Sequence, residues 1–284
     1  MGKFTEIFIV SDYDGTFTSH IPENYRKNIE AVERFKKGGG IFTFATGRDY
    51  LSLLSIEPAF ESIINAPVII ANGARLYDAN KKDYIFNYTM NLTLFSEFLE
   101  IISEEYPEIG IRFSCENGMV ALNLNEILKN DLDDIFMRTM SVREMSMREL
   151  LKSGEKAYKC VMVHNPETLD LVIGIAEKFN AAKNREFLFS KSYPRGLEAV
   201  NSKSSKGETA LKLKEYLSAG NGRNYKLFAI GDYDNDLSMI KLADYGAAPG
   251  NALEHVKKAS GIITVNCDGG AIADLIGIIE REYL

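Results

Sequence analysis

Short apolar runs, each closed by a small or polar residue, are the feature that most constrains the fold of this 284-residue chain. Five such runs lie near the two ends of the sequence, and none shows the alternation typical of a half-buried strand. Uninterrupted runs of this length are typical of strands covered on both faces, as in a parallel sheet. The five predicted strands are residues 7–10, 41–45, 68–71, 227–230 and 262–265.

Helical patterns separate these runs. Residues 24–37 place apolar side chains at helical spacing and end at three consecutive glycines. Residues 205–217 begin with Ser205 and Glu208, which have the spacing of a capping box. Strands that alternate with helices of this length predict an α/β fold with a doubly wound, Rossmann-like parallel sheet.

The middle of the chain differs from both ends. It lacks the Gly-Asp and Thr-Gly loops that follow the terminal strands. We therefore predict a core built from both ends of the chain and interrupted by an inserted α+β domain. The predicted segments are 1–86 and 196–284 for the core and 87–195 for the insert. Within the insert we expect helices at 95–102, 125–136 and 167–179 and strands at 120–124 and 160–163.

Charge and composition argue against several classes of protein. The formal net charge of −7 argues against a nucleic-acid binder that works through bulk electrostatics. No apolar stretch is long enough to span a bilayer, and the first residues lack the pattern of a secretory signal. We therefore expect a cytoplasmic protein with no membrane partner. The three cysteines have no Cys-x-x-Cys spacing, so neither a disulfide framework nor structural zinc is expected.

Polar residues follow several of the predicted strands at the point where each strand stops. Asp12 and Asp14 follow the first strand, Thr46 and Gly47 follow the second, and Asp232 follows the fourth. The carboxyl ends of parallel strands share one edge of the sheet, and ligands of open α/β sheets bind at that edge. We therefore expect these side chains to converge on one site.

The carboxylates at this edge predict a cation. Asp12 and Asp14 lie one residue apart, and ionised carboxylates held that close repel each other unless a cation, a proton or open solvent offsets the repulsion. Together with Asp232 they supply hard oxygen ligands in the number that suits Mg²⁺ bound beside a substrate phosphate. Mg²⁺ is therefore the predicted cofactor.

Three other residues at the same edge suit an anion. Thr46 offers a hydroxyl, and Gly47 offers an unobstructed backbone N–H. Lys206 falls at the first position of the helix capped by Ser205, where its ammonium and the helix N-terminus add positive potential. Carboxylates for a cation and donors for an anion together predict a phosphoryl-transfer site.

Four motifs, in order along the chain, resemble those of the haloacid dehalogenase (HAD) superfamily. They are DYDGT at 12–16, TGR at 46–48, SKG at 205–207 and GDYDND at 231–236. Three further segments resemble its Cof-type branch, whose members carry a large α/β cap of the C2 type after the third strand. These are ANGA at 71–74, PGNA at 249–252 and DGG at 268–270. The resemblance covers both core segments, and the insert has the length and position of such a cap.

The resemblance implies roles for individual residues. Asp12 would be the nucleophile that forms an aspartyl-phosphate, and Asp14 would be first the general acid and then the general base. Mg²⁺ would be bound by Asp12, by the backbone carbonyl of Asp14 and by Asp232. Asp236 would support these ligands without touching the metal.

The implied phosphate-binding residues are few. Thr46 and Lys206 would bind the transferring phosphoryl group, with the backbone of Gly47 as a further donor. Asn235 would contact the phosphate.

These inferences predict a Mg²⁺-dependent phosphatase that hydrolyses a small phosphorylated metabolite, such as a sugar phosphate, as a monomer or homodimer. A phosphomutase remains an alternative, because it would use the same intermediate and return the phosphoryl group to a bound sugar. A phospho-accepting regulatory protein is the alternative from a different class, since receiver modules also place acidic residues, a Thr and a Lys around Mg²⁺. The sequence identifies neither the substrate nor the residues of the insert that select it.

Overall fold

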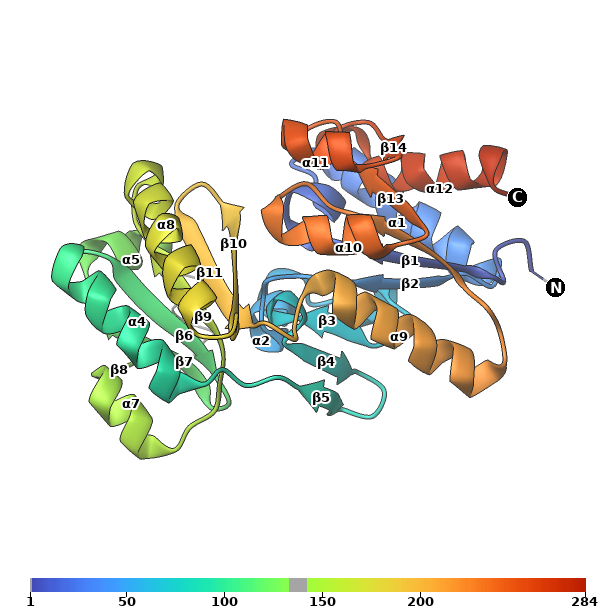
Figure 1. The fold of residues 1–284 in the computed structure, drawn as a ribbon. Coiled ribbons are helices and arrows are strands. Elements are labelled where there is room, and N and C mark those ends of the chain that lie inside the picture. The colour runs from blue at the N-terminus through green and yellow to red at the C-terminus, as the bar shows by residue number, and fades with distance from the viewer. Residues whose placement is uncertain (1, 133–141) are drawn as a thin grey trace. The chain divides into compact units, whose positions relative to one another are not determined.

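The computed structural model describes residues 2–132 and 142–284, and its contacts divide the chain into two compact units. Unit 1 comprises Met1–Gly47, Pro58–Phe86 and Ser205–Leu284, and unit 2 comprises Arg48–Glu57 and Asn87–Ser204. Both are drawn in Figure 1. Unit 1 is thus assembled from both ends of the chain, whereas most of unit 2 is one continuous insert.

A five-stranded parallel sheet forms the centre of unit 1, in the order β14-β13-β12-β1-β2. The central strand β1 pairs with both β12 and β2, and Ser11 lies opposite Ile230 on one side and Phe44 on the other. Every residue of β1 is buried, which accounts for its uninterrupted apolar run. The strands are β1 (Ile7–Ser11), β2 (Ile41–Phe44), β12 (Lys226–Ile230), β13 (Tyr245–Ala248) and β14 (Ile262–Ile263).

Helices cover both faces of this sheet, which confirms the doubly wound α/β prediction. On one face α9 and α10 pack together and place Leu213 and Met239 in a core with side chains of β1 and β12. On the other face α1 packs against α12, and Tyr283 beyond α12 contacts the ring of Phe228. The helices are α1 (Pro22–Lys37), α3 (Phe60–Ile63), α9 (Lys206–Asn221), α10 (Leu237–Leu242), α11 (Glu254–Ala259) and α12 (Ala271–Glu282).

The strands of unit 1 differ from the prediction in several respects. The third predicted strand belongs mainly to a separate sheet, in which β3 (Val68–Ile70) pairs antiparallel with β4 (Arg75–Asp78), the neighbour of β5 (Asp83–Asn87). An isolated parallel bridge between Ala45 and Ile69 connects β3 to the end of β2. β13 is absent from the predicted strands, because glycine and alanine have little preference for a strand.

Short helical turns follow four of the strands and carry most of the sequence motifs. They are η1 (Tyr13–Phe17), η2 (Ala71–Gly73), η3 (Asp234–Asp236) and η4 (Cys267–Gly269). The residues of these motifs therefore lie in tight turns at the carboxyl ends of strands.

A six-stranded sheet forms the centre of unit 2, in the order β10-β11-β9-β6-β7-β8. α4 (Leu92–Glu105) and α8 (Pro166–Ala182) bury Phe95 and Phe179 in a core with Phe113 of this sheet. α5 (Glu126–Asp131) contributes Leu128 to a second core, built on alternate residues of β9. The remaining elements are β6 (Gly110–Cys115), β7 (Gly118–Asn123), β8 (Val142–Glu144), β9 (Ala157–Val163), β10 (Phe187–Tyr193), β11 (Gly196–Asn201), α2 (Tyr50–Ile56) and α7 (Met147–Ser153).

Strand β11 belongs to the sheet of unit 2, where it pairs with β9 and β10. The predicted boundary after residue 195 assigned this strand to the core, whereas the contacts divide the chain after Ser204. The boundary was misplaced because the sheet to which β11 belongs depends on its pairing with other strands, and a local apolar pattern does not reveal that pairing. The role of the insert as a cap stays a prediction, and residues 133–136 of the expected helix 125–136 lie outside the described residues.

The described helices give no membrane-spanning segment. Across residues 2–132 and 142–284, none combines the length and the apolar character that a crossing of the bilayer needs.

Candidate active site

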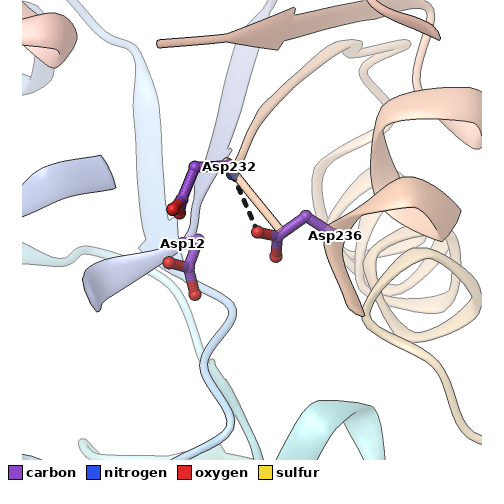
Figure 2. Close-up of side chains that lie close together, drawn as sticks. All are labelled: Asp12, Asp232 and Asp236. Atoms are coloured by element: carbon purple, nitrogen blue, oxygen red, sulfur yellow. Dashed lines mark hydrogen bonds between the residues drawn. The ribbon is translucent and has the colours of Figure 1, made fainter. Parts of the chain in front are cut away.

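The pairing of β1 with β12 brings the first and last acidic motifs together. The backbone N–H of Asp12 donates to the carbonyl of Ile230 (2.9 Å), so the ladder between the two strands continues to the predicted nucleophile. Asp232 follows β12 by two residues, and Asp236 ends the turn η3. Figure 2 shows the three carboxylates pointing toward one another. The expected convergence is therefore present for Asp12 and Asp232, and Asp236, which was expected only to support the metal ligands, lies with them.

Lys206 lies among these carboxylates. Its Nζ donates to Oδ1 of Asp12 at 2.5 Å and to Oδ1 of Asp236 at 2.6 Å, and its side chain is fully buried. The lysine begins α9, and the side chain of Ser205 caps this helix by accepting from the N–H of Glu208. One ammonium thus faces a cluster of three carboxylates, which leaves an excess of negative charge.

Burial and the excess negative charge together shift the pKa values of the groups in this cluster. Burial raises the pKa of Asp12 well above its ordinary value; Lys206 opposes this shift, and nearby Asp236, Asp232 and Asp14 add to it. Burial and the charge of Asp236 raise the pKa of Asp232 to about 6. Burial lowers the pKa of Lys206, but the two carboxylates outweigh burial, so the net shift is upward and the ammonium stays charged. A further cation would therefore favour the ionised carboxylates.

The acidic cluster fits a hard divalent cation. One carboxylate oxygen from each of Asp12, Asp232 and Asp236 lies within 4.8 Å of the others. Oxygen ligands of this kind suit Mg²⁺, which binds through one or two carboxylates plus waters and substrate oxygens. The donor set is therefore compatible with the predicted metal.

Asp236 also organises the backbone of its own loop. Its Oδ2 accepts from the backbone N–H groups of Asp232 (2.9 Å) and Tyr233 (3.1 Å). A Cβ at Gly231 would lie 2.4 Å from the Cβ of Asp236, so only glycine allows this tight loop. Asp236 therefore holds Asp232 in place while it pairs with Lys206, a contact that the sequence analysis did not assign.

The turn after Asp12 is also tightly packed against Asp232. Gly15 has φ +73°, and a Cβ there would lie 2.6 Å from Oδ2 of Asp232. The hydroxyl of the next residue, Thr16, donates to Oδ1 of Asp232 at 2.8 Å. Asp14, which precedes this glycine, is exposed. Asp12, the predicted nucleophile, is thus buried, and Asp14, the predicted acid, is accessible to solvent.

The ANGA turn is built from residues in a rare backbone conformation. Ala71, Asn72 and Gly73 all have positive φ, which is unusual for alanine and asparagine and which concentrates at functional sites. The carbonyl of Gly73 accepts from the hydroxyl of Thr209 at 2.8 Å, and a Cβ at Gly73 would lie 2.2 Å from the carbonyl oxygen of Ser205. This turn therefore packs directly on the start of α9, which carries Lys206.

The other predicted phosphate-binding residues occupy neighbouring loops. Thr46 is fully buried; its backbone N–H donates to Ile69 (2.9 Å), and its carbonyl accepts from Asn72 (3.0 Å). Gly47 follows it in the same loop. The Nδ2 of Asn235 donates to Oδ1 of Asn72 at 3.1 Å, so these two motifs contact each other. The roles of Thr46, Gly47 and Asn235 toward a phosphate stay predictions.

Known proteins resemble this chain over almost its whole length. A family model described as haloacid dehalogenase-like hydrolase matches residues 9–276. An uncharacterized hydrolase of Schizosaccharomyces pombe is 31% identical over 287 residues, which cover 97% of this chain and 90% of that protein. Pyridoxal phosphate phosphatase YbhA of Escherichia coli is 23% identical over 277 residues, which cover 94% of this chain and 96% of that enzyme.

The solved structures agree with the sequence relatives. A haloacid dehalogenase-like hydrolase from Bacteroides thetaiotaomicron superposes with a TM-score of 0.74 at 25% identity, covering 98% of this chain and 100% of that one. The family match and the fold agree with the expected resemblance. The chain therefore belongs to the haloacid dehalogenase-like hydrolases, and it is a phosphoric monoester hydrolase of their Cof-type branch.

Proposed function

We propose that this phosphatase is Mg²⁺-dependent and hydrolyses a small phosphorylated metabolite through an aspartyl-phosphate on Asp12. The observation that carries the proposal is the convergence of Asp12, Asp232 and Asp236 around the buried ammonium of Lys206. This arrangement provides a carboxylate nucleophile, ligands for a cation and a positive group in one place.

The chemistry of the first step follows from two aspartates. A carboxylate oxygen of Asp12 forms a bond to phosphorus while the bond between phosphorus and the substrate oxygen breaks. Asp14 donates a proton to that leaving oxygen, which departs as an alcohol. In the second step Asp14 accepts a proton from water as the water oxygen attacks phosphorus and releases Asp12. Its exposed position on the turn η1 suits exchange of protons with solvent.

The surrounding residues would hold the charges that this chemistry creates. When bound, Mg²⁺ would supply positive charge beside the phosphoryl oxygens, held by Asp12, Asp232 and the carbonyl of Asp14. Lys206 orients Asp12 through the 2.5 Å contact and opposes the rise that burial causes in the pKa of Asp12. We assign Thr46, the N–H of Gly47 and Asn235 to the phosphoryl oxygens and Asp236 to the support of Asp232.

The substrate class is proposed from the relatives and the division of the chain. The Escherichia coli relative is named for pyridoxal phosphate, a small phosphomonoester. We assign contacts with the part of the substrate that is not phosphate to unit 2. A phosphomutase would use the same residues of this site, so analysis of the products from sugar phosphates separates it from a phosphatase.

The Asp12→Asn variant tests the nucleophile. We expect Mg²⁺-dependent hydrolysis of p-nitrophenyl phosphate to fall by a factor on the order of 10⁴ or more, as for removal of other catalytic nucleophiles. Asp244→Asn is the matched control, because Asp244 accepts from the N–H of Leu227 (2.7 Å) at the opposite end of the parallel strands. Full activity in Asp12→Asn, with the fold intact by circular dichroism, would refute the mechanism.

The Asp14→Asn variant separates the acid role from a structural one. p-Nitrophenolate leaves readily without a proton, whereas an alkoxide does not. We therefore expect the variant to lose more activity on a sugar phosphate than on p-nitrophenyl phosphate. Equal losses on both substrates would argue against Asp14 as the general acid.

A further inference from the structure

The turn of residues 249–253, which follows β13, contacts three of the loops at the carboxyl edge of the sheet. The N–H of Leu253 donates to the carbonyl of Asp232 at 3.1 Å. The side chain of Asn251 donates through Nδ2 to the carbonyl of Gly15 at 2.9 Å, and its Oδ1 accepts from the N–H of Cys267 at 2.8 Å. One short turn therefore bridges the loops that follow β1, β12 and β14.

Two of these loops carry the candidate metal ligands. Gly15 is bonded to Asp14, and its own carbonyl is the atom that Asn251 holds. The carbonyl of Asp232 is held by the same turn, two residues further along the chain. The Asp12–Asp14 loop and the Asp232 loop are thus both hydrogen-bonded to the turn of residues 249–253.

We propose that Asn251 is a positioning residue that sets the separation of these two loops and thereby the affinity for the divalent cation. The inference rests on the proposed function and extends it to a residue that does not itself touch the metal or the reacting atoms. Groups that orient metal ligands without binding the metal commonly change metal affinity by about 10- to 100-fold when they are removed.

The chemistry of the side chain explains why an asparagine suits this position. A primary amide offers a donor and an acceptor on one short rigid group, so it bridges a carbonyl and an N–H at the same time. Aspartate would keep the acceptor toward Cys267 but would place a second oxygen against the carbonyl of Gly15. Alanine would lose both contacts.

The exposure of Asn251 makes its role separable from folding. The side chain is exposed, so water can satisfy the two backbone groups after truncation, and little stability should be lost. Water cannot, however, hold the two loops at a fixed distance. The expected defect is therefore in metal binding rather than in the fold.

The loop between β1 and α1, which contains Asp12, Asp14 and Gly15, is also held at its far end, near the start of α1. Oδ1 of Asp268 accepts from the N–H of His20 (2.6 Å) and from the hydroxyl of Ser19 (3.2 Å), and its carbonyl accepts from Nδ2 of Asn24 (2.6 Å). Asp268 thus anchors the start of α1, whereas Asn251 anchors the residue next to Asp14. Asn251 therefore holds the part of this loop next to the candidate metal ligands, and Asp268 holds the part that leads into α1.

The chain offers a matched control at the other end of the sheet. Asn65 is also exposed, and it also bridges two backbone groups: its Nδ2 donates to the carbonyl of Gly40 (3.0 Å), and its Oδ1 accepts from the N–H of Phe42 (2.8 Å). These groups lie at the beginning of β2, away from the carboxyl edge that carries the aspartates. Asn65→Ala therefore removes the same two kinds of hydrogen bond without touching the site.

The experiment compares Asn251→Ala, Asn251→Asp and Asn65→Ala with the unmodified full chain. Mg²⁺ affinity of the metal-free proteins is measured by isothermal titration calorimetry without substrate, together with melting temperature and hydrolysis of p-nitrophenyl phosphate. We expect Asn251→Ala to weaken Mg²⁺ binding by about tenfold, and Asn251→Asp at least as much. Asn65→Ala should keep wild-type Mg²⁺ affinity while it melts at a temperature similar to that of Asn251→Ala.

The outcomes distinguish this inference from the proposed function. Unchanged Mg²⁺ affinity in Asn251→Ala, or an equal loss in Asn65→Ala, overturns the positioning role while Mg²⁺ dependence of the wild type still stands. If the unmodified chain itself neither binds Mg²⁺ nor needs it for hydrolysis, the proposed function fails first and this inference fails with it.

Discussion

Each unit buries a lysine against carboxylates, and the two arrangements differ in their charge balance. In unit 1, Lys206 faces Asp12 and Asp236, with Asp232 nearby. In unit 2, Lys159 of β9 lies 2.8 Å from Glu198 of β11, with both side chains about 95% buried (5% and 4% exposed). Lys159 and Glu198 carry opposite charges of equal size, whereas Lys206 faces more than one carboxylate. A buried lysine beside one carboxylate balances its charge, whereas a buried lysine among several carboxylates leaves negative charge that a cation would offset.

Removal of the lysine in unit 1 should have the largest effect. Lys206→Met leaves buried carboxylates without their ammonium, so we expect the free energy of unfolding of the metal-free protein to fall by about 3–5 kcal/mol. Phosphatase activity should be lost as well. Because the remaining charge is entirely negative, added Mg²⁺ should restore part of the stability, as urea denaturation would measure. A variant that keeps its stability without metal would show that the cluster is less charged than its geometry indicates.

Removal of the lysine in unit 2 should destabilise the protein without involving metal. Lys159→Met leaves the carboxylate of Glu198 buried without the ammonium of Lys159, with an expected loss of about 3–5 kcal/mol that Mg²⁺ does not restore. The double variant Lys159→Met/Glu198→Leu should recover most of this loss, since apolar residues of similar volume often replace a buried ion pair without penalty. Recovery by Mg²⁺ in the single variant would contradict the comparison of the two units.

The pH dependence of stability should reveal the excess negative charge of the aspartate cluster in unit 1, with a smaller effect than the two lysine substitutions. The pKa of Asp232 is raised to about 6 from 3.8, so between these values the folded state binds more protons than the unfolded state. Stability of the metal-free protein should therefore fall as pH rises from about 4 to 6. Asp232→Asn removes this charge and keeps an oxygen for the hydroxyl of Thr16. We expect it to stabilise the metal-free protein by roughly 1–2 kcal/mol at pH 7.5.

The stability gain of Asp232→Asn should disappear near pH 4, where Asp232 of the wild type is protonated. Saturating Mg²⁺ should reverse the order of stability at pH 7.5, because only the wild type keeps the full set of ligands. Chemical denaturation at the two pH values, with and without Mg²⁺, measures both effects. A pH-independent difference between the proteins would refute the assignment of the shift to Asp232.

The reactivity of the cysteines toward alkylation should also differ between the two units. This is the smallest of the expected effects, and it does not involve stability. Burial raises the pKa of Cys115 in unit 2 to about 12, and Cys160 is also buried. Cys267 of unit 1 is partly exposed. Since alkylation requires an accessible thiolate, iodoacetamide at pH 8 should modify Cys267 well before the other two. Mass spectrometry of the native protein measures the order, and rapid modification of Cys115 would contradict the closed core of unit 2.

The fold and the centre of the site were predictable because local patterns encode them. Apolar runs closed by a small or polar residue mark the ends of buried strands, and Ser205 marks the start of α9. Strand ends of a parallel sheet must share an edge, so the convergence of Asp12 with Asp232 follows once the strands are known. Long-range choices were not predictable: the pairing of β11 with unit 2 and the separate sheet of β3 depend on partners distant in sequence.

The contacts within the site show the same limit. The sequence placed Lys206 beside a phosphate, but its contacts with Asp12 and Asp236 depend on how α9 sits on the sheet. The PGNA and DGG motifs were visible, yet neither gave a role for Asn251 or Asp268. A hydrogen bond from a side chain to a distant backbone carbonyl leaves no periodic pattern in the sequence, so only the structure identifies such residues.

The position of β1 between β12 and β2 has a consequence for the order of assembly during synthesis. Thr16 and its partner Asp232 are separated by 216 residues, which a ribosome adds in roughly 10–40 s at about 5–20 residues per second. Until then the apolar residues of β1 lack the strand on one side, whereas most of unit 2 is already continuous and complete. One edge of this buried apolar strand thus stays without its partner in the nascent chain until β12 has been synthesised.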